Sequence, residues 1–190
     1  MRKFLVVLDD SRECLNAMRF AAMRAAHTGG GVTVLSVIPP DEFNHWIGVA
    51  EVMREEARER IHAHFEVFAK WMRDKQGVDP ELAIREGDPV PQIIEHVQSD
   101  PEIGVLVLGA GTDKKGPGPL ITQLTKSSGS LPIPITIVPG DLSKEKLEES
   151  SGVFDTPVKK MGRNSDCSTM RFFVGYTQRT TFHEMQIGIT

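Results

Sequence analysis

Short apolar runs recur along the first 140 residues of the chain, and several of them show no alternation between apolar and polar positions. They end at acidic, glycine or proline residues, which is typical of strands that are buried on both faces of a sheet. The pattern predicts five strands, at residues 3–8, 32–38, 81–86, 103–108 and 133–138. Strand 103–108 reads IGVLVL, with Gly104 as its only break.

The segments between these strands carry apolar residues at helical spacing. They predict helices at about residues 11–27, 41–75, 89–98 and 119–128. In the second helix, apolar residues keep a 3.6-residue period from Ala50 to Met72, and charged residues fill the other face. The third helix begins with a suitable N-cap, Asp88, followed by Pro89. Strands that alternate with helices predict an α/β fold, with a parallel sheet covered on both faces.

In such folds, ligands bind beyond the carboxyl ends of the strands, where the strand order reverses. This rule places Asp9, Val37 and the segment 109–112 on one rim of the sheet. The segment after the fourth strand reads GAGTDKKGPGPLIT, which contains glycines, lysines and prolines but neither GxxxxGK[ST] nor GxGxxG. The segment is therefore a candidate phosphate-binding loop or only a connection.

The amino-acid composition of the chain changes after Pro139, where the regular alternation of apolar runs and helical patterns ends. Residues 143–152 have the composition of a solvated linker with at most a helical turn, and residues 170–178 and 181–190 have strand-like composition. The last two segments could form a hairpin, which would have to pack on another surface to be stable. We divide the chain into a domain over residues 1–140 and a linker with a C-terminal extension over residues 141–190, whose composition allows flexibility.

Composition limits the class of protein. The chain has 190 residues, is 39% hydrophobic and 25% charged, and carries a net charge of -4, which argues against a nucleic-acid-binding protein. It contains no apolar run long enough for a membrane span and its N-terminus does not resemble a signal peptide, so we expect a cytoplasmic protein. The two cysteines cannot form a disulfide framework, and the histidines do not have metal-ligand spacing. We therefore expect no metal site.

Five motifs, in order and at the right spacing, give the chain a family resemblance. They are 6-VVLDDS-11, 34-VLSVIPP-40, 86-EGDPVPQII-94, 105-VLVLGAG-111 and 132-PIPITIV-138. Over residues 1–140 the chain resembles the universal stress protein family. The resemblance implies an open five-stranded parallel sheet of order 3-2-1-4-5, adenine nucleotide alpha hydrolase-like, with helices on both faces. Many family members form dimers through the last strand, and a subset binds ATP.

The resemblance also implies a set of nucleotide-binding residues. In ATP-binding members, an aspartate after the first strand contacts the adenosine, and the backbone of the second strand contacts the adenine. The loop after the fourth strand reads G-x-x-G, then nine residues, then G-[ST]. The residues that match these positions are Asp9, Val37, Gly109, Gly111 or Thr112, and Thr122. The implied ligand is ATP, ADP or AMP.

The loop departs from the family pattern. Ile121 places a branched side chain where the pattern has glycine, and Pro117 and Pro119 remove two backbone N–H donors. We expect this loop to be poorly ordered or to take a path that differs from the family's. Lys114 and Lys115 could offer charge in place of the missing donors.

Three functions remain open. The first is a regulator with ATP or AMP bound, and the second is a dimeric adaptor whose nucleotide pocket is altered. The third, an adenine-nucleotide-dependent hydrolase, is disfavoured because the S-G-G-x-D-S loop of the ATP pyrophosphatases is absent after the first strand. The substitutions in the loop favour weak or absent ATP binding. We expect a homodimer through strand 133–138, unless residues 170–189 fold back onto that edge, and a protein partner is a further expectation.

Overall fold

The structure is a computed structural model that describes residues 2–9, 11–40, 50–114 and 116–152. The elements follow one another as β1 (Lys3–Val7), α1 (Cys14–Thr28), β2 (Gly31–Ile38), α2 (Ala50–Gln76), β3 (Glu81–Glu86), α3 (Pro89–Ser99), β4 (Ile103–Ala110), α4 (Pro119–Lys126), the 3-10 turn η2 (Ser128–Ser130), β5 (Ile135–Pro139) and α5 (Lys144–Ser151). All five predicted strands are confirmed, and the four predicted helices are present with shifted ends. The expected start of the second helix, over residues 41–49, lies outside the described residues.

The five strands form one parallel sheet of order β3-β2-β1-β4-β5, which confirms the expected order. In the centre, Phe4 of β1 lies beside Val32 of β2 and Val105 of β4. The chain moves outward from β1 to β3, returns to β4 and then moves outward on the other side. The strand order therefore reverses between β1 and β4, and this is where a ligand site is expected.

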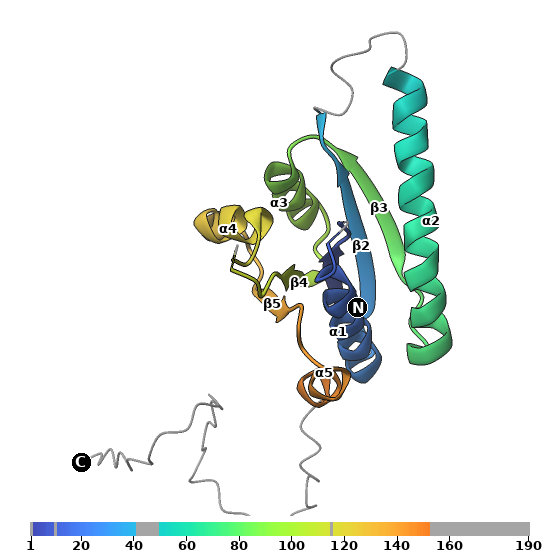
Figure 1. Cartoon of the computed structure of the whole chain (residues 1–190), viewed down its shortest axis with the longest axis vertical. Coiled ribbons are helices and arrows are strands. Elements are labelled where there is room, and N and C mark those ends of the chain that lie inside the picture. Colours follow the sequence, from blue (N-terminus) through green and yellow to red (C-terminus); the bar gives the residue numbers. More distant parts are fainter. Residues whose placement is uncertain (1, 10, 41–49, 115, 153–190) are drawn as a thin grey trace, which may run out of the picture. The chain divides into compact units, whose positions relative to one another are not determined.

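Helices cover both faces of the sheet, with α1, α2 and α5 on one face and α3 and α4 on the other (Figure 1). Neighbouring residues of β1 pack on opposite faces of the sheet. Val6 packs into the core under α1 and α2, and Leu5 packs into the core under α3 and α4. Both side chains are fully buried. Because each face has its own apolar core, the strands read as continuous apolar runs in the sequence.

The expected linker over residues 143–152 is instead a helix that packs against the core. Ser143 caps α5 by accepting a hydrogen bond from the Lys146 backbone nitrogen, and Leu147 is buried against α1 and its neighbours. The Ser151 carbonyl lies 3.2 Å from Nδ1 of His27, near the end of α1. The compact unit therefore continues past residue 140 and includes α5.

A single buried amide fixes the connection between β5 and α5. Asn16 on α1 is only 6% exposed, and its Nδ2 lies 3.3, 3.0 and 3.1 Å from the carbonyl oxygens of Pro139, Gly140 and Leu142. These contacts direct the chain from the end of β5 onto α1. The strand-like segments 170–178 and 181–190 lie outside the described residues, as does most of the extension over residues 141–190.

No helix in the described ranges has both the length and the apolar character needed to cross a membrane.

Candidate functional site

Two neighbouring cavities lie where the carboxyl ends of β1, β2 and β4 meet. The larger, of about 700 Å³, lies between the end of β1, the start of α1, the loop after β4 and the start of α4. The smaller, of about 240 Å³, lies between the ends of β1 and β2 and one face of α2. Asp9 lines both cavities. The site therefore straddles the switch point between β1 and β4, as the strand order predicts.

The carboxylate of Asp9 is held in place by a local turn. Its Oδ1 accepts hydrogen bonds from the backbone nitrogen of Ser11 at 3.0 Å and from the Ser11 hydroxyl at 2.5 Å. The Ser11 hydroxyl oxygen in turn accepts a hydrogen bond from the Cys14 backbone nitrogen at 3.3 Å, which satisfies a donor at the first residue of α1. Asp9 is exposed at the rim and lines both cavities.

The two glycines that the family resemblance implies, Gly109 at the end of β4 and Gly111 in the loop after it, serve close contacts within the protein. A Cβ atom on Gly109 would lie 2.9 Å from the Cys14 backbone nitrogen, and one on Gly111 would lie 2.8 Å from the Gly116 carbonyl oxygen. The Gly111 N–H donates to the Pro117 carbonyl at 3.3 Å. Both glycines line the larger cavity, but their small size is required by the packing of the loop itself. The Gly111 N–H is already used by this internal hydrogen bond.

The start of α4 forms another wall of the larger cavity. Pro119 is the first residue of α4, a position where a backbone N–H has no partner within the helix, so this proline costs the helix no internal bond. Ile121 is 5% exposed and packs into the core under α3 and α4, although it also lines the cavity. The Thr122 hydroxyl donates to the Gly118 carbonyl at 2.9 Å. Ile121, the branched side chain at the position where the family pattern has glycine, is therefore also a core residue.

The structure brings together most of the residues that the resemblance implies. Four of them, Asp9, Gly109, Gly111 and Thr122, line the larger cavity, and Val37 lines the smaller one. Thr112 is exposed and lines neither cavity.

Sequence reasoning missed several charged or polar residues of the site. They are Ser11, Glu13, Asp113 and Lys126 at the larger cavity, and Ser36, Arg60 and His64 at the smaller one. Spacing offered one signal: Arg60 and His64 are four residues apart on the helix that follows β2, so they share a helix face.

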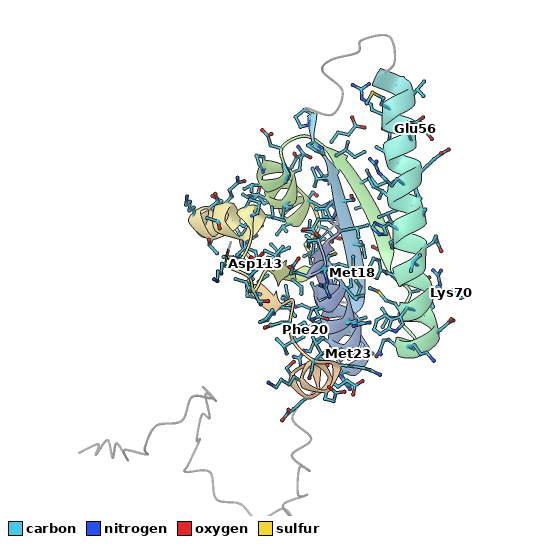
Figure 2. The ribbon with its side chains drawn as sticks, viewed as in Figure 1. Met18, Phe20, Met23, Glu56, Lys70 and Asp113 are labelled. Atoms are coloured by element: carbon cyan, nitrogen blue, oxygen red, sulfur yellow. The ribbon has the colours of Figure 1, made fainter. Side chains whose placement is uncertain are left out.

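The ionisable lining of the larger cavity is mainly acidic. Of the charged side chains that the structure describes there, Asp9, Glu13 and Asp113 are carboxylates and Lys126 is an ammonium group. Figure 2 shows Asp113 in the loop between β4 and α4. Lys114 is exposed and is not part of the lining, and residue 115 lies outside the described ranges. The cavity therefore presents more negative than positive charge to a ligand.

A search of the described part of the chain finds no group of three or more His, Cys, Asp and Glu side chains that could hold a metal ion.

The fold and the position of the cavities define the class of protein. A parallel sheet of order 3-2-1-4-5 with a cavity between β1 and β4 is an adenine nucleotide alpha hydrolase-like α/β fold. A sequence model described as the universal stress protein family matches residues 1–116. Because this match spans more than half of the chain, the protein belongs to the universal stress protein family.

Solved structures of this family share the fold. Universal stress protein UspA from Lactobacillus plantarum has a TM-score of 0.61 and 16% identity, covering 72% of this chain and 97% of its own. A family member from Burkholderia pseudomallei has a TM-score of 0.57 and 16% identity, covering 72% and 95%. A family member from Arabidopsis thaliana, with AMP bound, has a TM-score of 0.53 and 19% identity, covering 77% and 95%. A comparison with curated protein sequences gave no match.

Proposed function

We propose that this chain is a cytoplasmic, regulatory universal stress protein whose adenine-nucleotide site is altered, so that ATP binds weakly or not at all. The observation that carries the proposal is the acidic lining of the larger cavity, where the family's phosphate-binding loop lies. Adenine nucleotides are the ligand class to test because a family member of the same fold, from Arabidopsis thaliana, has AMP bound.

Electrostatics oppose a triphosphate in this cavity. Three carboxylates and one ammonium group leave a net of two negative charges among the described lining residues. One adverse pair of unit charges at about 4 Å costs about 1 kcal/mol even in water, and more where solvent is excluded. Two net negative charges, each about 4 Å from a phosphate, would weaken triphosphate binding by about 2 kcal/mol, or about 30-fold.

The backbone offers little compensation. Pro117 and Pro119 carry no N–H, and the Gly111 N–H donates to the Pro117 carbonyl. A hydrogen bond to a charged group contributes about 1.5–3 kcal/mol, so each lost donor weakens phosphate binding further. The triphosphate position is thus poor in positive charge and lacks these three backbone donors.

A competent nucleotide-binding regulator is the second candidate. The larger cavity has a volume within the usual range of small-molecule sites, and the start of α4 forms part of its wall. Both features would suit a nucleotide if the acidic side chains were screened. The two candidates differ in the affinity for ATP, which can be measured.

Isothermal titration calorimetry with ATP, AMP and adenosine tests the proposal. We expect ATP to bind no more tightly than AMP. Replacing Glu13 with glutamine keeps its shape and removes one repulsive charge, so Glu13→Gln should raise ATP affinity about fivefold and leave adenosine affinity unchanged. Glu56→Gln is the matched control, because Glu56 is exposed on α2 and lines neither cavity (Figure 2). Submicromolar ATP affinity in the unmodified protein would overturn the proposal.

A further inference from the structure

The loop side of the larger cavity lacks or already uses several hydrogen-bond donors. Pro117 and Pro119 carry no backbone N–H, and the Gly111 N–H donates to the Pro117 carbonyl at 3.3 Å. The Thr122 hydroxyl donates to the Gly118 carbonyl at 2.9 Å. This wall therefore suits a ligand group that donates hydrogen bonds better than one that only accepts them.

Glu13 is a carboxylate that the packing of its neighbours holds in this cavity. It directly precedes α1, and its side chain is half-buried between two glycines. A Cβ atom on Gly140 would collide with Cγ of Glu13, and one on Gly111 would lie 3.8 Å from its Oε1. The stem of Glu13 is therefore packed against Gly140, and its carboxylate lies toward the loop after β4.

The carboxylate of Glu13 is available to a ligand. Across the residues that the structure describes, it forms no ion pair and no side-chain hydrogen bond. The other two carboxylates of the lining are engaged: Asp9 accepts hydrogen bonds from Ser11, and Asp113 has an interaction within the protein. Glu13 is therefore the carboxylate that a ligand can pair with at the lowest cost.

Positive charge on the loop side is too small to cancel Glu13. Lys126 is the last residue of α4, about 10 Å along the helix axis from Pro119 at its start. The start of α4 carries about half a positive charge, which is less than the charge of one carboxylate. The loop side of the cavity therefore favours a cation over an anion.

We propose that the larger cavity takes an adenosine whose 5′ substituent is an ammonium group, and that Glu13 selects this group. The inference rests on the proposed function, because it takes the ligand to be an adenosine derivative. In the orientation that the family resemblance implies, Asp9 contacts the adenosine and Val37 the adenine, so the 5′ group enters the larger cavity beside the loop. An ammonium group supplies both the positive charge and three donors.

Calorimetry with three ligands that differ only at the 5′ carbon tests this inference. They are 5′-amino-5′-deoxyadenosine, adenosine and AMP. The amine and the hydroxyl are similar in size, but the amine is protonated at pH 7. We expect the amine to bind about fivefold more tightly than adenosine, the effect of one carboxylate about 4 Å from a unit charge. AMP should bind more weakly than adenosine.

Two variants connect this preference to Glu13. Glu13→Gln keeps the shape of the side chain and removes its charge, so the ratio of amine to adenosine affinity should fall to about one. Glu56→Gln should keep the fivefold ratio, because Glu56 is exposed on α2 and lines neither cavity. Circular dichroism would verify that both variants fold.

Four results would overturn the inference. They are an amine that binds no more tightly than adenosine or does not bind at millimolar concentration, AMP that binds more tightly than adenosine, a ratio that survives Glu13→Gln, and a ratio that is lost in Glu56→Gln. The proposed function fails on a different measurement, submicromolar ATP affinity, so the two failures can be told apart.

Nuclear magnetic resonance gives an independent readout of the contact. Addition of 5′-amino-5′-deoxyadenosine should shift the carboxylate carbon resonance of Glu13 more than an equal occupancy of adenosine does. Equal shifts for the two ligands, or a larger shift at Asp113 alone, would show that Glu13 does not bind the ammonium group.

Discussion

Gly109 lies directly against the start of α1, so close that a Cβ atom on it would be 2.9 Å from the backbone nitrogen of Cys14 and would collide with the Glu13 carbonyl. The contact joins the carboxyl end of β4 to the first turn of α1, and both border the larger cavity. Because both partners in this contact are backbone atoms, neither can rotate away. The position therefore requires glycine for packing, whether or not a ligand binds nearby.

Gly109→Ala should destabilise the protein. The added methyl group must displace backbone, and overpacking of this kind costs about 1–3 kcal/mol. For a protein of this size, the melting temperature should fall by about 2–4 °C for each kcal/mol. Thermal denaturation followed by circular dichroism measures the change. Gly129→Ala is the matched control, since a Cβ atom there would meet nothing within 4 Å. Equal melting temperatures for the two variants would contradict the packing role of Gly109.

Asn16 should determine whether α5 stays docked on α1. Its amide Nδ2 lies within 3.3 Å of three carbonyl oxygens of the turn after β5. Asn16→Ala leaves buried acceptors without this donor and should cost about 1–3 kcal/mol. Asn16→Asp should be worse, because its carboxylate would face carbonyl oxygens.

Hydrogen–deuterium exchange would show where the protection is lost. In Asn16→Ala the increase in exchange should be concentrated in residues 139–151, with β1 and β2 little changed. A uniform increase along the chain would mean that Asn16 stabilises the whole core and not this connection.

The contrast between α5 and the sheet shows what the sequence could predict. The strands were predicted because each is buried on both faces and reads as a continuous apolar run, and the order of the sheet followed from the family resemblance. The helix α5 was missed because Leu147 is its one buried large apolar side chain among many charges. A helix that is held by one leucine and by polar contacts from α1 gives no apolar periodicity to detect.

Prediction from the sequence was also incomplete for the candidate site. Asp9 and the loop glycines could be placed on one rim because strand ends converge in a parallel sheet. The inward position of Ile121 could have been read from its spacing with Leu124, three residues on, since both are buried in α4. The positions of Glu13 and Arg60 at the cavities could not be predicted, because they depend on how the start of α1 and one face of α2 meet each cavity.

His96 should make the stability of the protein depend on pH. Its Nδ1 accepts a hydrogen bond from Nε of Arg85 at 3.3 Å, and burial, followed by the nearby Arg85 charge, lowers the pKa of His96 below its usual value of 6.5. Lys3 acts in the same direction and Asp100 opposes it. Below about pH 6.5 the unfolded chain binds a proton at this histidine more readily than the folded protein does, so the free energy of unfolding falls as the pH falls.

Urea denaturation at pH 7.5 and 5.5 measures this effect. His96→Gln can still accept a hydrogen bond from Arg85 but does not titrate, so its loss of stability between the two pH values should be smaller than that of the unmodified protein. His62→Gln is the control, because His62 is exposed on α2. If His96→Gln loses as much stability on acidification as the unmodified protein, His96 is not the group responsible.

Strand β5 is the edge at which we propose that two copies of the chain associate. It pairs only with β4 within the described sheet, and Ile137 on it is 44% exposed. The opposite edge, β3, has exposed glutamates at both ends, Glu81 and Glu86, and charges of this kind discourage strand pairing. An open apolar edge can pair with the strand of a second copy, which favours a homodimer through residues 133–138.

Multi-angle light scattering at micromolar protein concentration should report a dimer. Ile137→Lys places a charge on this edge, directly opposite the second strand, and should shift the protein to a monomer without unfolding it. Val67→Lys is the matched control, because Val67 is 68% exposed on α2, away from β5. A monomeric unmodified protein would contradict the proposed dimer. A dimer that persists in Ile137→Lys but is lost in Val67→Lys would place the association surface away from β5. Such a result would leave β5 as an edge that does not pair between copies.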